Sequence, residues 1–222
     1  MSTVIYEESA VRGPNVGTST SLFRLLRLHL MSRRVPSAVV VLVVCAPLMQ
    51  LAVRSSLGQG DLASTTTSAK QLSLLLEAAV AGVVSAALHG PFGESERTAG
   101  RRLPWLRLTT TLLLTMVALG TVCVGVLGAG LPTSDFALVR DEAGLIGIGV
   151  LCTVIVGGHF GWAGPAVYWV IGSYAIADRW QSPWTWPARA GGDVGAELCA
   201  FAFFVVSLLA ITIIGPRQYS RD

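Results

Sequence analysis

The chain is poor in charged residues. Asp, Glu, Lys and Arg make up only 13% of its 222 residues, about half of what soluble domains usually carry. Hydrophobic residues make up 52%, and the mean hydropathy is +0.62. This composition argues against a soluble globular domain and predicts a protein that crosses a lipid bilayer several times. The net charge of +3 is too small to favour nucleic acid as a partner, whereas the headgroups of the lipid bilayer suffice to bind the arginines.

Several motifs that would indicate chemistry are missing. No GxxxxGK[ST] phosphate-binding loop occurs, so we expect no ATP site in this chain. Ser85 and Ser207 lack the setting of an intramembrane serine protease, and His89 and His159 lie in no HExxH motif. The cysteines lie inside apolar runs without CxxC spacing and are interpreted as packing residues: Cys45, Cys123, Cys152 and Cys199. We therefore expect no enzyme, no metal site and no cofactor in the chain itself.

Six apolar segments approach the length of about 20 residues that a membrane-spanning helix needs. They are Pro36–Val53, Leu72–His89, Leu106–Leu131, Ala143–Gly158, Gly164–Ala177 and Val194–Ile214. The fourth and fifth are short and are separated only by HFGWAG, so a broken or re-entrant pair is the alternative to six full crossings. The expected fold is all-α, with a six-helix transmembrane domain over residues 36–217 between cytoplasmic segments at 1–35 and 218–222.

The positions of Arg and Lys predict the orientation, because cytoplasmic loops carry an excess of these residues. With six crossings, eleven of the sixteen basic residues lie on the side that carries both termini. The other side carries five, namely Arg54, Lys70, Arg140, Arg179 and Arg189. Both termini are therefore expected in the cytoplasm, with the chain in the inner (plasma) membrane of the cell.

Two segments are expected at the membrane surface. In TSTSLFRLLRLHLMSRR, residues 18–34, most of the leucines share one helical face and Arg24 and Arg27 lie towards the other, which predicts an amphipathic interfacial helix. An ordinary basic flank of the first span is the alternative. In DRWQSPWTWPARAGGD, residues 178–193, three Trp and two Pro are crowded together. Because Trp favours the headgroup layer, this segment predicts a re-entrant hairpin that dips into the outer leaflet.

Charge gathers at one place in the interior of the chain, GPFGESERTAGRRLPWLR, residues 90–107. Gly and Pro at both ends frame a short helix that begins with acidic residues, where the helix dipole favours them. The predicted orientation puts this loop on the cytoplasmic face. This loop is either a binding site for a cytosolic partner or a solvated loop whose arginines only fix the membrane topology.

This order of elements resembles the membrane subunits of ABC-2-type transporters, and GESERTAGRRLP looks like the inner-loop segment of such permeases from GC-rich bacteria. The resemblance implies that the loop 90–105 docks on a separate ATPase subunit, which would hold ATP and Mg. The implied docking residues are Glu94, Glu96, Arg97, Arg101 and Arg102. A second copy or a related permease is also implied, since a six-span chain is half of such a transporter. The expected function is the permease subunit of an ATP-driven exporter.

Glu77 lies within the second predicted span and Glu197 near the start of the sixth, and ionisable residues in spans are functional candidates. Glu77 lies deeper in its span. It either faces a substrate path or pairs with Arg54, Lys70 or Arg140. Since it lies only about 7–8 Å from the predicted start of its span, we expect exposure to headgroups. Arg140, Asp141 and Glu142 are expected at the outer start of the fourth span, where acids suit a helix N-terminus.

Two other functions stay open: a non-transporting scaffold or accessory protein that binds a cytosolic partner, and a secondary carrier that uses Glu77 as a proton site.

Overall fold

A computed structural model describes residues 35–57, 62–88, 103–129 and 135–215. These ranges contain six α-helices and two short 3-10 helices. The α-helices are α2 (Val35–Leu57), α3 (Leu62–Ala87), α5 (Leu103–Ala129), α6 (Asp135–Ile155), α7 (Ala163–Ala177) and α8 (Val194–Ile213). The 3-10 helices are η2 (Gly158–Phe160) and η3 (Trp186–Ala188). The prediction of an all-α chain is confirmed, and each of the six apolar segments corresponds to one helix.

Three of these helices contain a segment that is long and apolar enough to cross a membrane. The segments are Lys70–Ala87 in α3, Pro104–Gly125 in α5 and Val194–Ile213 in α8. The apolar stretch of α2, Pro36–Leu48, is shorter. α7 has 15 residues and is thus about 22 Å long, and α6 begins with several charged residues. By the length and composition of its helices, the chain is a multi-pass membrane protein.

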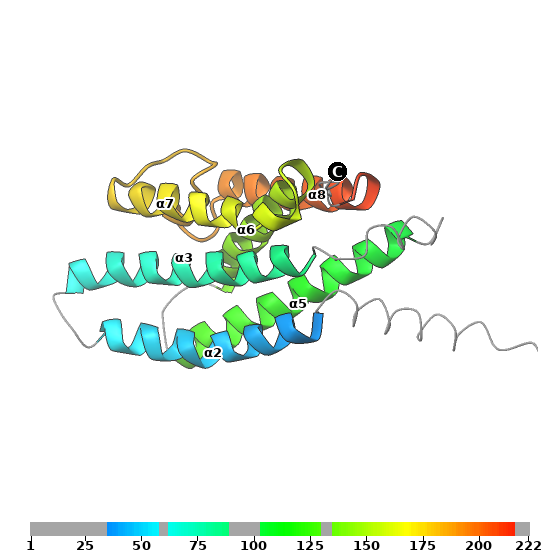
Figure 1. Cartoon of the computed structure of the whole chain (residues 1–222). Coiled ribbons are helices and arrows are strands. Elements are labelled where there is room, and N and C mark those ends of the chain that lie inside the picture. Colours follow the sequence, from blue (N-terminus) through cyan, green and yellow to red (C-terminus); the bar gives the residue numbers. More distant parts are fainter. Residues whose placement is uncertain (1–34, 58–61, 89–102, 130–134, 216–222) are drawn as a thin grey trace, which may run out of the picture.

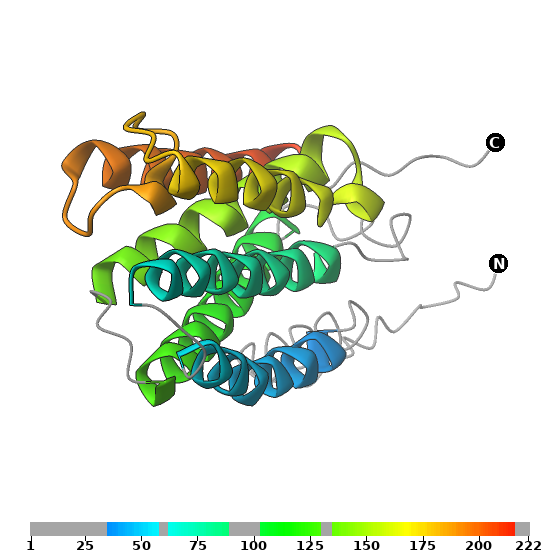
Figure 2. The same ribbon diagram turned by 90° about the vertical axis from the view of Figure 1, so that its left-hand side faces the viewer.

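The helices are arranged around α3 and α6 (Figures 1 and 2). In both views α2 lies on one side of α3, α7 and α8 lie on the other, and α5 crosses obliquely from the side of α2 towards that of α8. The most extensive pairings join α6 to α8, α2 to α5 and α3 to α7, and α3 also packs against α2 and α6. The two middle helices therefore carry the contacts that hold the bundle together.

The interior of α6 is buried almost all round. Every residue from 142 to 147 is buried, as are Val150, Thr153 and Val154 further along. A helix that is apolar on all sides needs neighbours on all sides, and α3, α5, α7 and α8 supply them. Gly147 permits the close contact with α8, because a Cβ atom there would lie 2.9 Å from the backbone of Phe203 and Phe204.

The outward faces of the bundle are apolar and exposed. On α8 the exposed side chains include Leu198, Phe201, Val205 and Leu209, and on α2 they include Val40, Val44 and Leu51. Hydroxyl groups in α5 are satisfied inside the helix: Thr111 donates to Arg107 O at 2.8 Å, and Thr115 donates to Thr111 O at 2.8 Å. Both features suit helices that contact hydrocarbon, where no water is present to bond a polar group.

Two helices begin eight or more residues before their predicted starts. α3 begins at Leu62 instead of Leu72, and α6 begins at Asp135 instead of Ala143. Hydropathy marks only the apolar part of a helix, and the polar residues before it contain no Gly or Pro to end the helix. HFGWAG forms η2 and a turn between two separate helices, and Gly157 before η2 has φ 121°, a conformation that favours glycine.

Candidate functional site

A buried arginine organises one end of the bundle. Arg140 lies in the second turn of α6, and its side chain is 1% exposed. Its Nη2 donates to Trp186 O at 2.8 Å and its Nη1 to Ala190 O at 3.1 Å. Its Nε donates to the Asp141 carboxylate at 2.9 Å. The guanidinium group therefore ties α6 to the connection between α7 and α8.

That connection, residues 178–193, is a folded element that packs on the helices. Trp186 is fully buried and stacks on Tyr168 of α7, with ring centroids 4.6 Å apart. The Tyr168 hydroxyl donates to Trp184 O at 2.8 Å. Gly144 of α6 leaves room for the indole, since a Cβ there would lie 2.5 Å from Trp186 Cζ2. Residues 178–193 thus form a segment packed on the helices, and a re-entrant hairpin that enters the outer leaflet stays a prediction.

Three carboxyl groups lie beneath this connection. Glu77 is 2% exposed and accepts a hydrogen bond from Ser73 Oγ at 2.8 Å. Glu142 is fully buried, and neither of its carboxylate oxygens has a hydrogen-bond partner within the described ranges. Asp141 is bonded to Arg140, and the charges of Glu77, Asp141 and Glu142 lie close enough to interact. We call Ser73, Glu77, Arg140, Asp141 and Glu142 the charge cluster.

The charge cluster corrects one sequence prediction. Glu77 is not exposed to headgroups but is 2% exposed, because α3 begins at Leu62 and Glu77 lies about 22 Å along the helix. Arg140, Asp141 and Glu142 lie within the first eight residues of α6, near the helix start as predicted, and Arg140 and Glu142 are buried there. Glu77 and Glu142 are buried with the Arg140 guanidinium, whereas Asp141 is partly exposed. Burial of charged groups is costly, and ionisable residues inside a membrane bundle usually serve proton or substrate movement.

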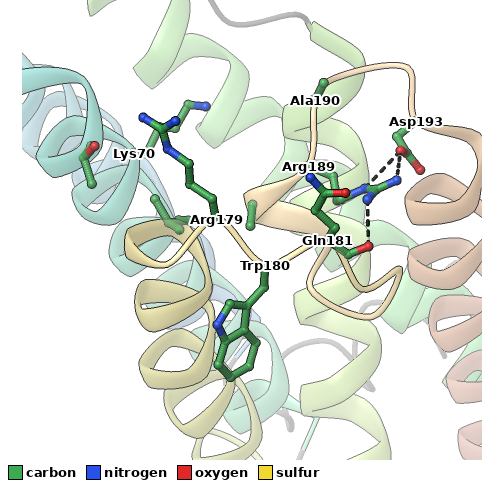
Figure 3. Close-up of a pocket in the computed structure, with 10 residues that line it drawn as sticks. Lys70, Arg179, Trp180, Gln181, Arg189, Ala190 and Asp193 are labelled. Atoms are coloured by element: carbon green, nitrogen blue, oxygen red, sulfur yellow. Dashed lines mark hydrogen bonds and ion pairs between the residues drawn. The ribbon is translucent and has the colours of Figure 1, made fainter. Parts of the chain in front are cut away.

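A polar cavity of about 500 Å³ opens beside the charge cluster (Figure 3). Its charged lining residues are Lys70 of α3 and Arg179, Arg189 and Asp193 of the α7–α8 connection. The Asp193 carboxylate caps α8 by accepting from Ala196 N at 3.0 Å, and it accepts from Arg189 Nε at 3.0 Å. These bonds lower the pKa of Asp193, first through the Ala196 amide and then through Arg189.

The other residues predicted for function lie outside the described part of the chain. They are Glu94, Glu96, Arg97, Arg101 and Arg102 of the predicted docking loop, and Arg24 and Arg27 of the predicted interfacial helix. Arg107, at the edge of the loop, lies in α5. The four cysteines are free thiols within helices. Across the described ranges, no group of three or more His, Cys, Asp or Glu side chains is placed to hold a metal ion.

Comparison with known proteins adds no relative. No family model matches the chain, and neither a curated protein nor a solved structure matches it.

Proposed function

We propose that the chain is the permease subunit of an ATP-driven exporter. In this proposal all six helices cross the membrane, both termini lie in the cytoplasm, and the loop 90–105 docks on a separate ATPase. ATP and Mg would be bound by that ATPase, and this chain would convert its motion into rearrangement of the bundle.

The observation that carries the proposal is the arrangement of the helix ends. The starts of α2 and α5 and the ends of α3 and α8 lie at one end of the bundle, on the right in Figure 1. Arg107 near the start of α5 contacts Gly215 after α8, where a Cβ would lie 2.1 Å from Arg107 Nη1. The folded α7–α8 connection lies at the opposite end. The end of α3 and the start of α5 therefore lie at the same end of the bundle as Gly215, the last described residue. This arrangement is what a docking loop between α3 and α5, on the same side as the C-terminus, would require.

The proposal also requires a second permease copy or a related subunit. An apolar groove of about 520 Å³ runs between α3 and α7 and is lined by small residues and by Trp162 and Trp169. Small residues allow the backbones of two membrane helices to approach closely. This groove supports an association of the chain with another membrane helix.

The test is co-purification with the ATPase encoded beside this chain. We expect the wild-type chain to retain the ATPase, and the triple variant R97E/R101E/R102E to lose it by charge reversal. The control R217E/R221E reverses charge in the C-terminal tail on the same predicted side and should retain it. Equal retention by the wild type and the triple variant would show that the docking assignment is wrong. A cysteine at Ser95 that is labelled only from outside would overturn the predicted orientation.

A second candidate function, a proton-coupled carrier, is favoured by one specific observation. Glu77 and Glu142 are buried together, and Glu142 has no hydrogen-bond partner among the described residues. Two buried carboxyl groups that share a site can exchange a proton for a cationic or neutral substrate. In the exporter, these two carboxyl groups would not transfer protons.

Cellular accumulation of a panel of fluorescent dyes separates these functions. Inactivation of the ATPase should raise accumulation if the chain is an exporter subunit, and a protonophore alone should raise it if the chain is a carrier. E77Q and E142Q should abolish extrusion by a carrier, whereas E197Q, a matched change in the first turn of α8, should not. A non-transporting scaffold would respond to none of these changes.

A further inference from the structure

The polar cavity has more positive than negative charge. Lys70, Arg179 and Arg189 line it together with a single acid, Asp193. Both oxygens of the Asp193 carboxylate are already engaged, since Oδ1 accepts from Ala196 N, and Oδ2 accepts from Nε and Nη2 of Arg189. Arg189 Nη1 donates to Gln181 O at 2.7 Å. Arg189 and Asp193 therefore neutralise each other, and the charges of Lys70 and Arg179 remain.

Lys70 and Arg179 both line the cavity, one from α3 and the other from the start of the α7–α8 connection (Figure 3). Both side chains are exposed, and neither makes a hydrogen bond or an ion pair with another residue of the described ranges. Asp178 precedes Arg179 but does not line the cavity, and Asp141, whose charge Lys70 reaches at longer range, is bonded to Arg140. Two neighbouring cations repel each other unless an anion lies between them.

The backbone gives a second, independent observation. Arg179 has φ 53° and is the sole non-glycine residue with positive φ within the described ranges. It ends α7 in a Schellman-type cap, in which Trp180 N donates to Ala175 O at 3.0 Å. Glycine fills this position at the lowest cost. An arginine held in a disfavoured conformation at the edge of a polar cavity indicates a role for its side chain.

The third observation concerns the level of the cavity in the membrane. Trp180 lines the cavity and contacts Trp184 edge-on, with ring centroids 6.0 Å apart. Trp side chains favour the headgroup layer, which is also the layer of the lipid phosphates. The volume of about 500 Å³ lies within the usual range of ligand sites.

We propose that this cavity is an anion site that binds a phosphate group between the Lys70 ammonium and the Arg179 guanidinium. The guanidinium group can bond two phosphate oxygens at once, and the ammonium group supplies a point charge. The phosphate can belong to an anionic lipid headgroup or be free in solution. The site is separate from the predicted docking loop, so the inference does not depend on an ATPase partner.

The test uses the full chain in two arms. In the first, the purified protein in neutral detergent is titrated with inorganic phosphate, with chloride as the reference. In the second, the protein is reconstituted in nanodiscs of phosphatidylglycerol or of phosphatidylcholine. The binding of a labelled anionic lipid to the protein is then compared between the two, because phosphatidylglycerol should compete for the site and phosphatidylcholine should not. K70Q and R179Q are each compared with R54Q, which removes one exposed charge from the end of α2 and lies outside the cavity.

We expect K70Q and R179Q each to weaken phosphate or phosphatidylglycerol binding by about tenfold or more, and R54Q to leave it unchanged. Binding in the lipid arm alone would assign a headgroup, and binding in the phosphate arm alone would assign a free anion. R179G separates the anion-binding role of the Arg179 side chain from the role of its backbone in ending α7. Glycine suits the positive φ better than arginine, so this variant should keep the helix end and still lose binding. The proposal is overturned if neither arm shows binding, or if R179G and K70Q bind as tightly as the wild type.

Discussion

Replacement of Arg140 by Met is the most direct test of how the α7–α8 connection is held. Met has similar length but no donors, so the carbonyls of Trp186 and Ala190 would lose partners at 2.8 and 3.1 Å. Asp141 would lose its ion pair at 2.9 Å. Removal of one partner of a buried ion pair costs about 3–5 kcal/mol, because the other charge stays buried without a partner. We expect R140M to lower the free energy of unfolding by about that amount.

The assay is unfolding of the purified protein in a mild detergent, followed by Trp fluorescence, since one of the affected carbonyls belongs to Trp186 itself. R179M is the matched control, because it makes the same chemical change at an exposed, unpaired position of the same end of the bundle. Its effect should stay within about 0.5 kcal/mol. The double variant R140M/D141N should recover part of the loss, since it also removes the unpaired carboxylate. If R140M unfolds at the same denaturant concentration as R179M, Arg140 does not anchor the connection.

Three further predictions use the same unfolding assay. G147A should lower the free energy of unfolding by about 1–3 kcal/mol, because its Cβ would lie 2.9 Å from the α8 backbone. The control G120A should be neutral or stabilising, because a Cβ there would have nothing within 4 Å. Equal effects of the two variants would refute the close α6–α8 contact. E142Q should be at least as stable as the wild type, because an amide of the same size has no charge to bury; a large loss would reveal a partner for the carboxylate. The pKa of Asp193 is lowered. Its contribution to stability is therefore present above the ordinary carboxyl pKa of about 4 and is lost as the pH falls through the lowered value. D193N should remove this part of the acid dependence of stability, and an unchanged pH profile would contradict a stabilising role of the Asp193 carboxylate.

The number and order of the helices could be predicted from the sequence, because apolar runs of membrane length are a strong signal. The bounds of α7 and α8 differ from the predicted segments by one residue at most. The starts of α3 and α6 were missed, since hydropathy is low where a helix projects beyond its apolar part. The absence of Gly and Pro from residues 62–81 and 135–143 was the signal that could have extended both helices.

The charge cluster could be predicted only in part. Glu77 was recognised as a functional candidate from its position in an apolar run, but its burial follows from the early start of α3. The bonds from Arg140 to Trp186 and Ala190 join residues 46 and 50 positions apart, and no local pattern encodes such a pairing. Trp and Pro crowding predicted a hairpin that dips into the outer leaflet, whereas the packing of Trp186 against Tyr168 and Gly144 is known from the structure alone.

The hydrogen bonds of Arg140 and the close contact of Gly147 with α8 limit how the helices can move. They join α6, α8 and the connection that precedes α8 into one rigid block. If α6 slid along α8 or the connection, buried hydrogen bonds would break or backbone atoms would clash. α2 pairs with α5 and reaches this block through α3, whereas α5 also packs directly against α6 and α8. We therefore expect a movement of α5 to be transmitted to the block directly, and a movement of α2 to be transmitted through α3.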